Sequence, residues 1–307
     1  MPISLTHLRL WFKMLTGRSV LHVRQDLGKC FSTEEIKGYY NDMTEKVTRL
    51  PQLLQTNDLP TLCISKGKRI EFPVGIFQYG LGAYDLYLTT GEDVYKKKFL
   101  QCAEWAYQHQ ESSGAWNTFQ HIYPKHPYGA MSQGEGVSLL IRGFTHEKKQ
   151  EYLNAAQKGI DFMLRPITDG GTTLYEGEDV IFREYAHRPA VFNGWIFAWF
   201  GLYDYVLVTR DEGDYKTLLD RSCDTFLRRL PQLSTWYWSK YDFDGRIASP
   251  FYHRLHIAQM QALYQMTGAE EFGLYAEKWA KNACNPLKKS IAFIYKVLQK
   301  IVEKKIP

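Results

Sequence analysis

Four segments of this 307-residue chain repeat one pattern of hydrophobic and polar positions. Each opens with aromatic, proline, glycine or histidine residues, runs on as an apolar helix, and is followed by a turn and a second, amphipathic helix. The segments recur about every sixty residues, which is typical of stacked αα-hairpins. The four openings are FPVGIFQYGLGAYDLYLTTG from Phe72, HPYGAMSQGEGVSLLIRGF from His126, RPAVFNGWIFAWFGLYDYVLV from Arg188 and SPFYHRLHIAQMQALYQMTG from Ser249.

The repeat predicts an all-α fold, an incomplete (α/α) toroid of about four αα-hairpins. The stretches SGAWNTF, GGTTLYE and STWYW predict short β-hairpin loops on one rim. We divide the chain into an N-terminal helical segment packed on the body (1–70), the toroid as catalytic domain (71–287) and a basic amphipathic C-terminal helix (288–307). Within the first segment, Ser32 or Thr33 followed by acids predicts a helix start.

The net charge of +5 is unevenly distributed. Residues 1–25 carry +4 and residues 288–307 carry +5, so the body between them carries −4, a distribution that does not indicate nucleic-acid binding. Both ends also show helical amphipathicity, so we expect peripheral contact with a membrane; the alternative is packing on the body or on another subunit. The apolar positions are Leu5, Leu8, Trp11, Phe12 and Leu15 at one end and Ile291, Ile294, Leu298 and Ile301 at the other.

Other classes of protein find no support in the sequence. No apolar run reaches the ~18 residues of a membrane span, and no signal peptide is evident, so we expect a cytoplasmic chain, peripheral at the inner face of the membrane. Five scattered cysteines form no CxxC pair and indicate neither a disulfide framework nor a zinc knuckle. No GxGxxG motif and no P-loop occur, so no organic cofactor is expected.

If the starts of the four apolar helices converge, they line one cleft. Aromatic rings beside amides and acids suit sugars, which offer an apolar face and a rim of hydroxyls. His253 and His256 lack a third ligand for a metal, so they hydrogen-bond substrate or a tyrosine, or are structural. The remaining candidates for substrate binding are Tyr79, Trp116, Tyr128, Gln133, Glu135, Arg183, Arg188 and Asn193.

Several of these segments resemble a known family. FPVGIFQYGL, PYGAMSQGEGVSLLIRGF, REYA, FNGW, GLYD and FYHRLHIAQMQALY occur in order over about residues 70–280. Together they resemble the C-terminal helical domain of D-glucuronyl C5-epimerase, which inverts C5 of glucuronate to iduronate within a heparan- or heparosan-type polymer. The β-rich domain that animal enzymes carry between the QYGL-like and GAW-like segments is absent here. The chain is therefore similar to a short bacterial-type member.

The resemblance implies four catalytic residues. Glu184 and Tyr185 match the family's Glu-Tyr pair, and Tyr252 matches the tyrosine that precedes a histidine in the last helix. We match Tyr237, in TWYWSK, to the tyrosine of a YDLR-like loop in the family. Lys240 then stands where the family has an arginine three residues on.

Inversion at C5 needs a proton removed from one face of the sugar and returned to the other. We expect Glu184 and Tyr252 to be the two acid/base groups, without deciding which serves which epimer. Tyr185, Tyr237 and Lys240 would neutralise charge on the substrate carboxylate. Because lysine cannot grip a carboxylate with two parallel bonds, Arg246 is the alternative.

The sequence thus predicts an epimerase that acts on an anionic, glucuronate-containing polysaccharide without cofactor or metal. The alternatives are a uronate polysaccharide lyase, a glycoside hydrolase that uses Glu184 and Glu135, and a non-catalytic glycan-binding toroid. The identity of the polymer and the oligomeric state, a homo-oligomer included, stay open.

Overall fold

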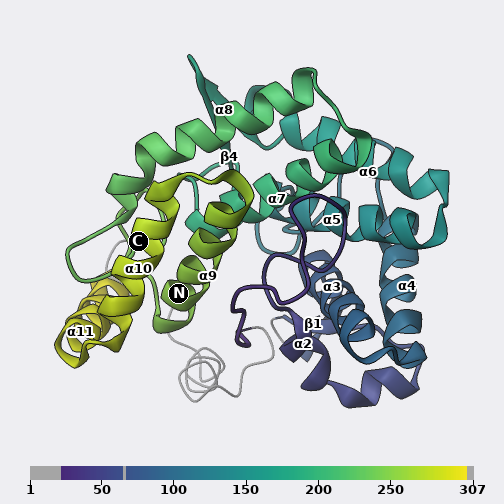
Figure 1. Ribbon diagram of the computed structural model, residues 1–307, viewed down its shortest axis with the longest axis horizontal. Helices are drawn as coiled ribbons and strands as arrows, with labels where there is room; N and C mark the ends of the chain where they lie inside the picture. Colours follow the sequence, from purple (N-terminus) through teal and green to yellow (C-terminus); the bar gives the residue numbers. More distant parts are fainter. Residues whose placement is uncertain (1–21, 65–66, 303–307) are drawn as a thin grey trace.

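The computed structural model describes residues 22–64 and 67–302. It confirms the all-α incomplete toroid: four αα-hairpins follow one another around a curved ring, with the second helix of each pair outside the first (Figure 1). The predicted helix within residues 1–21 lies outside the described residues. The pairs are α3 (Pro73–Thr90) with α4 (Asp93–Gln108), α5 (Ala130–Glu147) with α6 (Gln150–Leu164), α7 (Phe192–Thr209) with α8 (Asp214–Arg229), and α9 (Pro250–Thr267) with α10 (Glu270–Cys284).

The inner helices α3, α5, α7 and α9 are buried on most sides, which explains their mixture of small and aromatic residues. The closest pair is α5 with α7, where glycines replace side chains at the crossing. A Cβ atom at Gly134 would lie 2.5 Å from the Ala198 Cα, and one at Gly201 would lie 2.4 Å from the Gly134 Cα. These glycines therefore set how closely the two helices approach.

Short strands interrupt the helices. β1 (Thr61–Cys63) pairs antiparallel with β2 (Arg69–Glu71), and β3 (Thr173–Glu176) pairs antiparallel with β4 (Asp179–Phe182). GGTTLYE forms β3 as expected, and STWYW is bracketed by a bridge between Ser234 and Ser239. SGAWNTF forms turns instead of a strand.

The described part of residues 1–70 corrects one prediction, since most of it is irregular. Its regular elements are α2 (Thr44–Thr48), the 3-10 helix η1 (Pro51–Gln55) and the hairpin β1–β2. Ser32 does not start a helix; its Oγ accepts a hydrogen bond from Glu34 N in a bend. Tyr39, Tyr40 and Met43 of this part are buried in the core.

The N-terminal segment, residues 22–43, lies between the two ends of the ring, beside α9 and α3 (Figure 1). It contacts all four inner helices. Tyr39 N donates to Asp85 of α3, the Gly38 carbonyl accepts from Arg142 of α5, Tyr40 donates to Asp204 of α7, and the His22 ring lies 5.9 Å from the Tyr252 ring of α9. These contacts fill the centre of the incomplete ring.

Candidate active site

Glu184 lies at the centre of the ring because two helix starts close around it. It follows β4, and the preceding Arg183 carbonyl accepts a hydrogen bond of 2.8 Å from Ala130 N at the start of α5. A Cβ atom at Gly129 would lie 2.1 Å from the Glu184 carbonyl oxygen, and one at Gly194 would lie 2.5 Å from Glu184 Oε2. Glycines in PYGA and FNGW therefore make room for this one residue.

Three tyrosines surround the Glu184 carboxyl. Tyr185 hydrogen-bonds to it, and the phenols of Tyr252 and Tyr241 lie within electrostatic reach of it. The Tyr241 and Tyr252 rings are 4.7 Å apart in an edge contact. Burial raises the pKa of Glu184 to about 7, against the hydrogen bond from Tyr185, which lowers it.

Tyr252 occupies the first turn of α9. Pro250 begins the helix, and the Ser249 side chain accepts a hydrogen bond from Tyr252 N, so the turn is capped and the phenol is held at the ring centre. Burial, followed by the nearby Glu184 carboxylate, raises the pKa of Tyr252 above that of a free tyrosine. Burial also raises the pKa values of Tyr185 and Tyr241. All three phenols are therefore protonated at neutral pH.

A second buried carboxyl lies behind Glu184. Glu135 of α5 accepts a 2.7 Å hydrogen bond from Gln78 Nε2 of α3. Burial raises its pKa to about 8, Gln78 and Lys46 oppose that rise, and Glu184 adds to it. Burial also lowers the pKa of Lys46 to about 8. Lys46 is thus a buried cation within electrostatic reach of Glu135.

An aromatic and basic rim continues outward from Tyr185. Its ring packs 4.8 Å from Phe119, and the Arg188 guanidinium lies 5.8 Å from its centre. The exposed imidazoles of His126 and His187 stack at 4.5 Å beside it. This rim leads from the solvent to the carboxyl cluster and offers flat rings with positive charge.

The YDLR-like loop is placed differently from the prediction. Tyr237 packs with Trp238 and Ala292 in a separate cluster and lies against the C-terminal helix, 5.8 Å from the Tyr295 ring. Tyr241, which packs against this cluster, has its ring 4.7 Å from the Tyr252 ring.

The two basic candidates of this loop lie next to Tyr241. Lys240 precedes it in a segment bridged to Ile247, and the Arg246 Nε is 2.5 Å from the Asp242 carboxylate. The Arg246 guanidinium therefore forms an ion pair with Asp242, and this ion pair orders the turn that carries Tyr241.

His253 and His256 make their hydrogen bonds inside the protein, and the His256 ring lies 6.5 Å from the Tyr252 ring. Both are fully buried, and both place Nδ1 within 2.9 Å of the Ser239 hydroxyl. His253 also accepts from Ser239 N and reaches the Trp279 carbonyl through Nε2, so its hydrogen bonds are internal. In the described residues no group of three His, Cys, Asp or Glu side chains is arranged to hold a metal ion.

Several other candidates are part of the packing. The Trp116 indole is fully buried and donates to the Ala106 carbonyl. The Gln133 side chain hydrogen-bonds to both the backbone amide and the backbone carbonyl of Trp116. Tyr79 is buried near Cys102, between α3 and α4. These side chains shape the inner helices without reaching Glu184.

The last three candidates lie around the cluster. Tyr128 donates to Glu111 and packs on Phe162. Arg183 turns back to the Arg188 carbonyl. Asn193, the neighbour of Gly194, is buried, and its Oδ1 has no hydrogen-bond partner among the described residues.

Gln78 was expected at the cleft from the start of its helix, but three residues of this site were not among the sequence candidates: His22, Lys46 and Tyr241. For Tyr241 a signal existed, because the Tyr-Asp pair at 241–242 followed by Arg246 is closer to a YDLR-like pattern than TWYWSK is. His22 belongs to the irregular N-terminal segment and Lys46 to the short helix α2 that follows it, where no repeat marks a position as facing inward.

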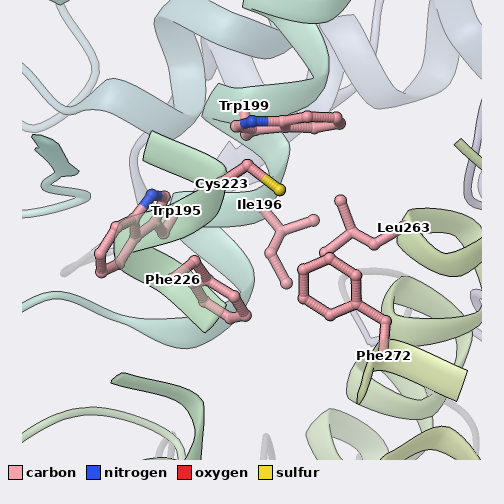
Figure 2. A pocket seen from close by; sticks show the side chains of 7 residues that line it. All are labelled: Trp195, Ile196, Trp199, Cys223, Phe226, Leu263 and Phe272. Atoms are coloured by element: carbon pink, nitrogen blue, oxygen red, sulfur yellow. The ribbon is translucent and has the colours of Figure 1, made fainter. Parts of the chain in front are cut away.

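An apolar pocket lies elsewhere, between α7, α8, α9 and α10 (Figure 2). It has no charged side chain and no unpaired donor: the Trp195 and Trp199 indoles both bind α8. It lacks the polar groups that a sugar requires and is a gap in packing. Its lining is Trp195, Ile196, Trp199, Cys223, Phe226, Leu263 and Phe272.

Several known proteins are similar to this chain in sequence or in fold. A family model described as the D-glucuronyl C5-epimerase C-terminus matches residues 103–281. The chain is 28% identical over 127 residues to a D-glucuronyl C5-epimerase of Caenorhabditis elegans. The aligned region covers 38% of this chain and 21% of that protein. It is 30% identical over 157 residues to an uncharacterised protein of Methanocaldococcus jannaschii, covering 49% and 51% of the two chains.

The match therefore spans about a fifth and about half of the length of these two curated relatives. Among solved structures, a UGL variant whose name also gives the sugar chain dGlcA-Glc-Rha-Glc superposes with a TM-score of 0.52 at 11% identity, over 78% of this chain and 66% of that one. This likeness concerns the fold.

Proposed function

This chain belongs to the D-glucuronyl C5-epimerase C-terminus family, and from that membership and the site we propose that it inverts C5 of glucuronate residues within a polysaccharide. The observation that carries the proposal is the meeting of Glu184 and Tyr252. They come from different repeats, lie in one buried cluster, and differ in proton affinity. An epimerase needs two acid/base groups of this kind on opposite faces of the ring.

The pKa values of Glu184 and Tyr252 support different roles for the two groups in the resting enzyme. With a pKa of about 7, Glu184 is largely ionised slightly above neutral pH and serves as the base that removes the C5 proton. Tyr252 holds its proton and serves as the acid that delivers it to the opposite face. One turnover leaves Glu184 protonated and Tyr252 ionised, and proton exchange with solvent restores both groups.

Charge that develops on the substrate carboxylate needs donors that are already in place. Tyr185 and Tyr241 are the donors beside Glu184 and Tyr252, and Tyr241 replaces Tyr237 in this role. Because both phenols are protonated, each can donate. Lys46 supports the buried negative charge from behind Glu135.

The rim formed by Phe119, His126, Tyr185, His187 and Arg188 supports a polymeric, anionic substrate. Rings suit the apolar faces of sugars, and the Arg188 guanidinium suits uronate carboxylates. The name of the UGL complex, with its dGlcA-containing sugar chain, supports a glycan in the same toroid fold.

The test is hydrogen exchange at C5. The protein is incubated with heparosan, and with other glucuronate polymers in parallel, in deuterated water, and the uronates are followed by proton NMR. We expect deuterium at C5 and iduronate signals. Glu184→Gln and Tyr252→Phe should lower both by at least a hundredfold, the lower end of acid–base contributions, whereas Tyr264→Phe, an exposed tyrosine of the same helix, should change neither.

Three results would contradict the proposal. An unsaturated uronate with chain shortening would assign a lyase, which forms the same carbanion and then expels the 4-linked sugar. Reducing ends without unsaturation would assign a hydrolase. Binding without exchange on every polymer would assign a glycan-binding toroid.

A further inference from the structure

The C-terminal helix α11 (Pro286–Val302) docks on the ring through its polar side. Lys296 Nζ donates to the Ile247 carbonyl at 2.7 Å, and Gln299 Oε1 accepts from Ile247 N at 2.9 Å. Ala292, one turn before Lys296 on the same face of the helix, is 3% exposed. The docked side of α11 is therefore formed by Lys296, Gln299 and Ala292, with Ile291 partly buried at its edge.

The opposite side of α11 is apolar and faces away from the ring. Successive residues of an α-helix are about 100° apart, which places Ile294 and Val297 across the helix from Ala292. Ile294 is 56% exposed, and Leu287 and Leu298 beside this face are 68% and 52% exposed. A helix that only packs on its own domain shows the reverse arrangement, with its apolar side inward.

The surroundings of this face are basic and aromatic. Residues 286–302 contain four lysines and no acid. Trp236, from the neighbouring loop, is 63% exposed, and Lys288 Nζ lies 5.9 Å from the centre of its ring. Exposed tryptophan and lysine beside aliphatic side chains are typical of groups that settle at the headgroup level of a bilayer.

We propose that α11 lies flat on an anionic lipid surface, with Ile294, Val297 and Leu298 inserted among the acyl chains and Lys288 and Lys289 at the headgroups. The charge of the helix matches anionic lipid, whereas a second copy of this face would bring lysines against lysines. In the described part of the chain, no helix has both the length and the hydropathy to cross a bilayer. The proposal is independent of the reaction at Glu184.

The experiment is vesicle flotation of the full chain. We expect it to float with vesicles of phosphatidylglycerol and phosphatidylcholine, to stay behind with pure phosphatidylcholine, and to be released by high salt. Ile294→Glu should lower the floated fraction at least tenfold. Leu274→Glu is the matched control: Leu274 is 65% exposed on α10, receives the same charge, and should leave flotation unchanged.

The proposal is overturned if the wild-type chain does not float with anionic vesicles, or if Ile294→Glu floats as well as the wild type. Light scattering gives the alternative occupant: a wild-type dimer that Ile294→Glu converts to a monomer, without vesicle binding, would assign the face to a second copy. Equal thermal midpoints of the two variants ensure that the comparison concerns folded protein.

Discussion

Arg142 and Asp204 form an ion pair sealed inside the ring, with Nη1 2.6 Å from Oδ2 and side chains 1% and 0% exposed. The same guanidinium donates to the carbonyls of Lys37 and Gly38, and the same carboxylate accepts from Tyr40. The pair therefore fixes the N-terminal segment against α5 and α7. Since this segment carries His22 and leads directly into α2, which carries Lys46, the pair also supports the composition of the site.

Asp204→Asn is expected to destabilise the fold by about 3–5 kcal/mol, because it leaves a buried guanidinium without its counter-charge. Tyr40→Phe removes one hydrogen bond to the same carboxylate and should cost about 1 kcal/mol. Urea unfolding followed by circular dichroism gives both free energies of unfolding. Equal losses in the two variants would contradict a dominant role of the ion pair.

Gly194→Ala should reduce C5 exchange at least tenfold without unfolding the protein. The new Cβ would lie 2.5 Å from Glu184 Oε2 and 2.7 Å from its Cβ, so the carboxyl must move, and a displacement of about 1 Å costs up to a hundredfold in rate. Gly273→Ala in α10 meets only ordinary contacts and serves as the control. The deuterium assay decides, and an unchanged rate for Gly194→Ala would remove Glu184 from the reaction.

The pH profile of kcat/KM for exchange should rise through about pH 7. The base must be ionised, and burial raises the pKa of Glu184 to about 7, so activity is low below that pH and levels off above it. The proton donor keeps its proton well past pH 10, because the pKa of Tyr252 is also raised. A midpoint near the usual glutamate value of about 4.5 would contradict this.

His253 and His256 should make the protein sensitive to acid. Burial lowers the pKa of His253 to about 3 and that of His256 well below its ordinary value, so the folded state binds fewer protons than the unfolded state. Their contribution is complete above about pH 6.5 and is lost as the pH falls toward 3.

The test compares His256→Gln with the wild type in urea unfolding between pH 6 and 4. The variant should show a smaller fall in the free energy of unfolding, by up to about 1.4 kcal/mol per pH unit. His126→Gln, at an exposed position, should keep the wild-type slope. Buried carboxyls with raised pKa, such as Glu135, act in the opposite direction in all three proteins, so the difference isolates the histidine.

The sequence by itself determined the repeat and therefore the fold. Apolar positions with a period of 3.6 and a spacing of about sixty residues are local properties of the chain, and αα-hairpins follow from them. It also placed Glu184, Tyr185 and Tyr252 together, because helix starts in consecutive hairpins meet on one side of a toroid.

Only the tertiary structure decided which neighbour faces inward. Tyr241 rather than Tyr237, and Gln78 rather than Tyr79, reach the cluster, because the direction of a side chain depends on how its loop or helix is rotated in the ring. Lys46 comes from the short helix α2, which follows the segment that Arg142 and Asp204 hold, more than ninety residues away in sequence. Such contacts depend on packing between distant segments, which no pattern of neighbouring residues records.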